Sequence, residues 1–168
     1  MTDRHDSPSR PTTRPLAAGA LLIGVGLGGF VDGIVFHQIL QWHNMLSAWL
    51  KPDTVVRIEV NMVWDGAFHA FCWVSVVAGL AVLWNAVRNP GVWNRTRTLV
   101  GGLLAGFGLF NLVEGVIDHH VLHLHHVHEG PDHLTADLLF LASGVALLLA
   151  GGWLLRVGPD ERPDPAGT

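Results

Sequence analysis

Four long runs of apolar residues dominate the chain, and polar residues are concentrated between them. The runs are Leu16–His43, Trp64–Val87, Leu99–His120 and Leu138–Leu155. Because a helix needs about 20 residues to cross the roughly 30 Å hydrocarbon core of a bilayer, we interpret each run as a membrane span. The runs are continuously apolar, whereas the strands of a membrane barrel alternate between apolar and polar positions. The pattern therefore predicts an all-α integral membrane protein, a bundle of four transmembrane helices.

The composition agrees with this prediction and narrows the classes of function. Only 14% of the 168 residues are charged, against about a quarter in ordinary soluble domains. The single cysteine, Cys72, excludes a disulfide framework, and the net charge of −4 offers no basic surface for nucleic acid. We therefore expect a lipid bilayer as the main partner. We predict one membrane domain at residues 15–157, with disordered tails at residues 1–14 and 158–168.

The basic residues predict the orientation of the helices. Eight of the ten lie on one side of the predicted spans: Arg4, Arg10, Arg14, Arg88, Arg95, Arg97, Arg156 and Arg162. Only Lys51 and Arg57 lie on the other side. Since cytoplasmic loops of membrane proteins carry an excess of basic residues, both termini are predicted to be cytoplasmic. We expect a multi-pass protein of the cell (cytoplasmic) membrane.

The third apolar run repeats the first at an offset of 82 residues. An acid, a glycine and two histidines are in register: Asp32, Gly33, His37 and His43 align with Glu114, Gly115, His119 and His125. The fourth run matches the second more weakly at an offset of 72 residues, with Asp65 on Asp137. This pattern predicts two duplicated helix hairpins. Functional sites of such repeat proteins lie near the interface between the repeats.

Acidic and histidine side chains on three of the helices fall at similar depths. At a rise of 1.5 Å per residue, counted from the nearest cytoplasmic arginine, Asp32, His69 and Glu114 lie at roughly 25–29 Å. By the same count His37, Asp65, Asp118 and His119 lie at roughly 31–35 Å. Ionisable groups at this depth are costly unless they face a partner or a water-filled cavity. We therefore expect a convergent polar site near the outer face.

Helical geometry places some of these side chains on common faces. Asp65 and His69 are four residues apart and share a face. His37 stands about 140° from Asp32 on a regular helix. One extra residue in a π-helical turn would align the two, and such turns favour functional sites. His43 and His125 reach the site only if the chain folds inward after the helices.

Carboxylate and imidazole groups together form the ligand set of iron, manganese, zinc and copper(II) sites. Bundle cores also hold dinuclear metal centres with glutamate and histidine ligands. We therefore predict a transition-metal site, with haem less favoured because several carboxylates lie beside the histidines. The candidate ligands are Asp32, His37, His43, Asp65, His69, Glu114, Asp118, His119 and His125.

Several interpretations of the function remain open at this stage. The first is a membrane metalloprotein; if it is an enzyme, an oxidoreductase is the expected type. The second is a metal-handling or assembly protein that serves a respiratory enzyme, and the third is a proton or ion pathway without metal. Buried acid–histidine pairs that only hold helices together are a structural alternative. The segment His119–His133 has seven histidines in fifteen residues; it either captures metal ions for the site or is exposed and only pH-sensitive. A homo-oligomer is compatible with all of these interpretations.

Three sequence segments carry a resemblance to known proteins. The runs GGFVDGIVFHQILQWHNMLS, WDGAFHAFCW and GLFNLVEGVIDHHVLHLHHVHE resemble a family of bacterial four-helix membrane proteins, domain of unknown function 2243. The resemblance covers Leu16–Leu155 and implies a multi-pass membrane protein without an established activity. The Asp-x-x-x-His spacing at Asp65 and His69 is similar to a copper-ligand spacing in a membrane subunit of particulate methane and ammonia monooxygenases.

Overall fold

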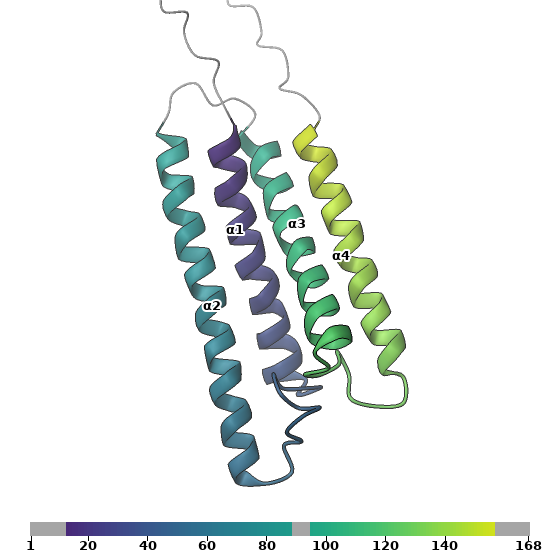
Figure 1. Ribbon diagram of the computed structural model, residues 1–168. Helices are drawn as coiled ribbons and strands as arrows, with labels where there is room; N and C mark the ends of the chain where they lie inside the picture. Colours follow the sequence, from purple (N-terminus) through teal and green to yellow (C-terminus); the bar gives the residue numbers. More distant parts are fainter. Residues whose placement is uncertain (1–12, 89–94, 157–168) are drawn as a thin grey trace, which may run out of the picture.

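The computed structural model describes residues 13–88 and 95–156 and is entirely helical in its regular elements (Figure 1). The elements are α1 (Arg14–Val31), η1 (Asp32–Ile39), α2 (Val55–Val87), α3 (Arg95–Glu114), η2 (Gly115–Val121) and α4 (His133–Arg156). Here η marks a π-helical segment that continues the preceding α-helix. Among the described residues, four helices are long and apolar enough to cross a membrane. The prediction of four helices of membrane-spanning length is thus confirmed.

The helix limits differ from the sequence prediction at the starts of α2, α3 and α4 and at the end of the first helical run. Helix α2 begins at Val55 instead of Trp64, because Thr54 caps it by accepting a hydrogen bond from the Arg57 N–H at 3.4 Å. The helical run from Arg14 ends at Ile39 instead of His43, because the chain reverses there. Apart from residues 13 and 14, the two predicted tails lie outside the described residues.

The helices stand in the spatial order α2, α1, α3, α4, with α1 and α3 in the middle (Figure 1). Helices α1 and α3 approach closely at Gly24 and Gly106: a side chain on Gly24 would collide with the Leu103 carbonyl, and one on Gly106 with the Leu21 carbonyl. Small residues at such crossings let membrane helices pack through their backbones. The first turn of α1 and the last turn of α4 lie at one end, and the loops after η1 and η2 lie at the other.

The two hairpins make matching contacts. Gly19 packs on Gly79 where α1 meets α2, and Gly101 packs on Gly151 where α3 meets α4. These positions correspond at the offsets of 82 and 72 residues found in the sequence. Since helices α1 and α3 also meet reciprocally, their polar ends are brought together at the loop end of the structure.

Both central helices end in the same irregular way. The π-helical turns close with hydrogen bonds from the Leu40 N–H to the Val35 carbonyl (2.8 Å) and from the Leu122 N–H to the Ile117 carbonyl (2.7 Å). Gln41 and His123 follow, each with a φ of 50°. Non-glycine residues rarely adopt this left-handed conformation, which here reverses the chain toward the helix ends. The π-helical turns that the sequence suggested are therefore present in both hairpins.

Candidate metal centre

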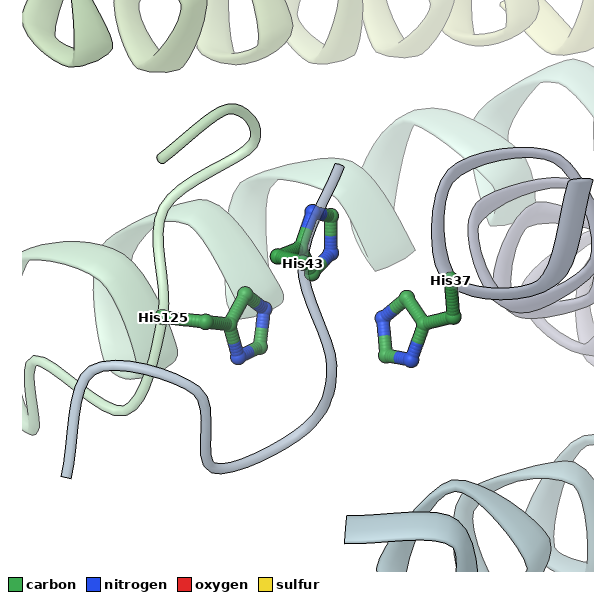
Figure 2. Close-up of side chains that lie close together, drawn as sticks. All are labelled: His37, His43 and His125. Atoms are coloured by element: carbon green, nitrogen blue, oxygen red, sulfur yellow. The ribbon is translucent and has the colours of Figure 1, made fainter. Parts of the chain in front are cut away.

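The reversed segments carry two histidines back into the protein. His43 is 3% exposed and His125 is 0% exposed, although both follow the ends of the spanning helices. Their rings stack in parallel, with centroids 4.6 Å apart and an interplanar angle of 4°. Figure 2 shows these two rings and that of His37, which comes from η1, gathered around a common space. The inward fold that the sequence required for His43 and His125 is thus observed.

Hydrogen bonds fix which nitrogen of these two rings is free. The Nδ1–H of His43 donates to the Val127 carbonyl at 2.8 Å, and that of His125 donates to the Met45 carbonyl at 3.1 Å. A carbonyl oxygen only accepts, so Nδ1 carries the proton and Nε2 presents its lone pair in the neutral ring. Burial, reinforced by the neighbouring His125, lowers the pKa of His43 to about 3. Burial also lowers the pKa of His125. Both rings are therefore neutral at physiological pH.

His37 and His119 are oriented by carboxylates from the outer helices. His37 Nδ1 lies 3.0 Å from Asp65 Oδ1 on α2, and His119 Nδ1 lies 3.2 Å from Asp137 Oδ1 on α4. Histidine ligands of metals are characteristically held through their second nitrogen by a carboxylate or a carbonyl. The four buried histidines of the described residues therefore each have an oxygen near Nδ1, although the His119–Asp137 contact falls outside hydrogen-bonding geometry.

The same two carboxylates also hold the loops in place. Asp65 accepts hydrogen bonds from the Met45 N–H at 2.8 Å and from the Asn44 side chain at 2.8 Å. Asp137 accepts one from the Val127 N–H at 2.9 Å, and His126 Nδ1 lies 2.7 Å from its other oxygen. Each carboxylate thus links a histidine on a central helix to the loop that carries its partner histidine.

Two further acids lie between the histidines and are almost completely buried. Asp32 is 1% exposed and Glu114 is 3% exposed. Asp32 Oδ2 lies 3.0 Å from His37 Nε2, and Asp32 Oδ1 lies 3.9 Å from His43 Nε2. Glu114 Oε1 lies 3.6 Å from His125 Nε2. The acids and histidines of the two hairpins therefore meet at one place.

Most of these polar atoms have no hydrogen-bond partner. Within the described ranges, both oxygens of Asp32 and of Glu114 lack one, as do the Nε2 atoms of His37, His43, His119 and His125 and the Nδ1 atom of His119. The Asp32–His37 pair is close, but its angles fall outside hydrogen-bonding geometry. Buried carboxylates without partners are expensive, because desolvation penalises the charged form. A cation among these atoms would offset that cost.

The free atoms are close enough to share metal ions. Three groups each bring their ligand atoms within 4.8 Å of one another, and the groups overlap. They are His37 with His43 and His125, Glu114 with His119 and His125, and Asp32 with His37 and Glu114. We call these six residues the His/carboxylate cluster. Imidazole nitrogen and carboxylate oxygen suit iron, manganese, zinc and copper(II), so the residues fit the predicted class of metal.

The structure brings six of the nine candidate ligands together and places the other three around them. Asp65 supports His37 from the side away from the cluster. His69 lies outside the three groups, since its Nδ1 donates to the Asp65 backbone carbonyl at 2.7 Å and its ring packs beside Phe30. Asp118 is partly exposed and lines a neighbouring cavity.

Two supporting residues were missing from the sequence-based candidates. Asp137 lies beside His119 Nδ1 as Asp65 lies beside His37 Nδ1, and His126 contacts Asp137. The 72-residue offset aligns Asp137 with Asp65, and the 82-residue offset aligns His126 with Asn44. The repeat pattern therefore contained the signal for both residues.

Four apolar helices enclosing a buried polar cluster define a multi-pass membrane protein, which sits in a lipid bilayer. The chain belongs to the family described as predicted membrane protein, domain of unknown function 2243, whose sequence profile matches residues 18–158. The resemblance seen in the sequence is thus confirmed. No curated protein and no solved structure matches the chain.

Proposed function

We propose that this protein is a membrane metalloprotein with a dinuclear transition-metal centre in the His/carboxylate cluster. The observation that carries the proposal is the set of buried, unpartnered Nε2 and carboxylate oxygen atoms around one space. The Nδ1 atoms of His37, His43 and His125 are already held by hydrogen bonds to oxygens, and that of His119 lies 3.2 Å from Asp137 Oδ1. Such a site has most of its ligands oriented before a metal arrives.

Six ligand residues, three from each hairpin, are enough for two metal ions. The first hairpin supplies Asp32, His37 and His43, and the second supplies Glu114, His119 and His125. The reciprocal glycine contacts and the paired π-helical turns support an origin by duplication. Three protein ligands for each ion leave coordination positions for a substrate, as catalytic metal sites require. An oxidoreductase is the enzymatic activity that iron, copper or manganese in such a site would supply.

The proposed orientation has both termini in the cytoplasm and the cluster near the outer face of the cell membrane. The excess of arginine near the start of α1, the start of α3 and the end of α4 supports it. The start of α1 and the end of α4 lie at the same end of the bundle, opposite the loops after η1 and η2 (Figure 1).

A second candidate function, metal handling for a respiratory enzyme, rests on a cavity among the loops. This cavity has a volume of about 590 Å³ and is lined by the loop after η1 together with His126 and Glu129. His43 also lines it, so the cavity connects the loop surface with the cluster. Histidine and glutamate along such a route would bind an incoming divalent cation. A metal carrier would release its ions readily, whereas an enzyme would retain them.

Metal analysis of the purified protein tests the proposal. We expect about two metal ions per chain by mass spectrometry, and a lower thermal unfolding midpoint in detergent after chelation. His125→Ala removes a ligand atom shared by two of the three groups, so it should lose most of the metal. His128→Ala is the matched control, because His128 is exposed and lies outside the cluster; its metal content should be unchanged.

One combination of results would refute the metalloprotein. The wild-type protein would hold no metal after growth in supplemented medium, and its unfolding midpoint would not respond to chelator. The cluster would then be a proton pathway or a structural acid–histidine network. A different metal content in His128→Ala would instead implicate the His-rich loop in binding.

A further inference from the structure

A second cavity reaches the His/carboxylate cluster from the side of the helices. It has a volume of about 450 Å³ and lies between α2 and α3, with Val25 of α1 on its wall. Its lining is mainly apolar and aromatic and includes Trp64, Phe68, Phe71, Phe110 and Val113. Among the described residues that line it, Glu114 and Asp118 supply the carboxylates. The volume is in the usual range for small-molecule sites, which are mostly apolar with a few placed polar groups.

The cavity borders the surface that faces lipid. Trp64, Phe71 and Val113 line it, and each is more than half exposed on a membrane-spanning helix. An exposed apolar side chain within a spanning segment contacts acyl chains, so a molecule dissolved in the bilayer would reach the cavity without crossing water. Its partner in the cavity would therefore be largely apolar.

The two carboxylates define the polar end of such a molecule. A carboxylate accepts hydrogen bonds and donates none, so it selects a ligand with a hydroxyl or another donor. Glu114 belongs to the cluster, and both of its oxygens lack hydrogen-bond partners within the described residues. A hydroxyl between Glu114 and Asp118 would therefore lie beside the proposed metal ions.

We propose that this cavity binds a lipid-soluble alcohol or quinol, which enters from the bilayer and lies with its hydroxyl against Asp118 and Glu114. This inference names the substrate class of the metal site and so rests on the proposed function. A comparison of the two hairpins supports a specific site. The residue of the first hairpin that corresponds to Asp118 is Phe36, which stacks on Trp42 with ring centroids 5.4 Å apart. The first hairpin therefore has no acid at this position, and the carboxylate of Asp118 is a feature of the second hairpin alone.

Photoaffinity labelling in detergent tests the inference. The probes are a long-chain alcohol that carries a diazirine and the matching alkane without the hydroxyl. The alcohol should label residues 64–71 and 109–118 saturably, and the alkane should label them with about five- to tenfold lower affinity, the value of one hydrogen bond. Excess short-tailed quinol and excess dodecanol serve as competitors; the one that competes at lower concentration identifies the natural head group.

Two variants at matching positions separate a blocked cavity from a disturbed fold. Val113→Phe fills the cavity, and Val31→Phe adds the same bulk at the corresponding position of the first hairpin, which is also exposed toward lipid. Saturable labelling should be lost in the first variant and kept in the second. Asp118→Ala should lower the affinity of the alcohol toward that of the alkane, with Glu114 left as the remaining acceptor.

Labelling that never saturates, or that Val113→Phe leaves intact, would overturn the inference. Equal labelling by alcohol and alkane would overturn the role of the carboxylates. The metal content of the same samples is measured in parallel. Saturable labelling of a protein without metal would uphold the binding site and refute the proposed function, whereas bound metal without labelling would do the reverse.

Discussion

The two hairpins agree where they hold the cluster and differ where they face the bilayer beside it. Each supplies one acid and two histidines, and each closes its central helix with a π-helical turn and a left-handed residue. At the positions just outside the cluster, by contrast, Phe36 corresponds to Asp118, and His69 corresponds to Leu141. The matched residues are those that orient possible ligands. The unmatched residues shape the surroundings, so the proposed access to the centre is one-sided.

The comparison also explains why the cluster is buried although it lies at the ends of the helices. Val127 accepts the hydrogen bond of His43, and Met45 accepts that of His125. Each loop therefore fixes the histidine of the other loop. Because the pair of loops is locked reciprocally, the stacked rings of His43 and His125 are held over the meeting point of the two halves.

The largest expected effect on the matched roles of the two hairpins comes from removing the carboxylates beside the histidines. Asp65→Asn and Asp137→Asn should each weaken metal binding by about 10–100-fold, the usual cost of losing such a partner. Both acids accept from a loop N–H and contact a histidine on a central helix. The two variants should therefore have similar effects, measured by competition with a chelator of known affinity.

A large effect in only one of these variants would contradict the matched roles of the hairpins. Glu59→Gln on α2 is a suitable control, because its exposed side chain lies outside the three ligand groups. Its metal affinity should equal that of the wild type.

A second test of the matched hairpins disturbs the contact at which helices α1 and α3 cross. Gly24→Ala and Gly106→Ala should each destabilise the protein by about 1–3 kcal/mol, the usual range for an overpacked core. In both cases the added methyl group meets backbone of the other central helix, which cannot move aside as a side chain can. Thermal unfolding in detergent measures the effect. Gly152→Ala is the control, since nothing lies within 4 Å of its added carbon. An equal loss of stability in all three variants would mean that the contact between α1 and α3 is not the cause.

The sequence was sufficient to predict the spanning helices and much of the cluster. Long apolar runs are almost sufficient by themselves to predict membrane spans. Burying an acid within a membrane span costs enough free energy that a partner is expected, and several histidines lie at the same depth. The repeat placed Glu114 in register with Asp32, and the awkward angle between Asp32 and His37 suggested the π-helical turn that is observed.

Other features depend on contacts that a single sequence does not display. The inward fold of His43 requires a left-handed φ at Gln41, a residue with no strong preference for it. The length of α2 depends on its cap at Thr54, outside the apolar run. Helical spacing predicts that His69 shares a face with Asp65, which made it a candidate ligand. Its Nδ1 instead donates a hydrogen bond to the backbone carbonyl of Asp65, one turn earlier on the helix. Local hydrogen bonds decided these positions.

The smallest expected effect comes from making the first hairpin resemble the second at residue 69. Leu141 occupies the corresponding place, where it packs against Gly115 as His69 packs against Gly33. His69→Leu should therefore leave the metal content unchanged and alter the stability by about 1 kcal/mol or less, since a side chain of similar size keeps the contact with Gly33. Mass spectrometry of bound metal, beside thermal unfolding, provides the measurement, with His37→Leu as the variant that should lose metal. Loss of metal from His69→Leu would mean that the ring leaves the Asp65 carbonyl to become a ligand, and the centre would then draw on three helices instead of two.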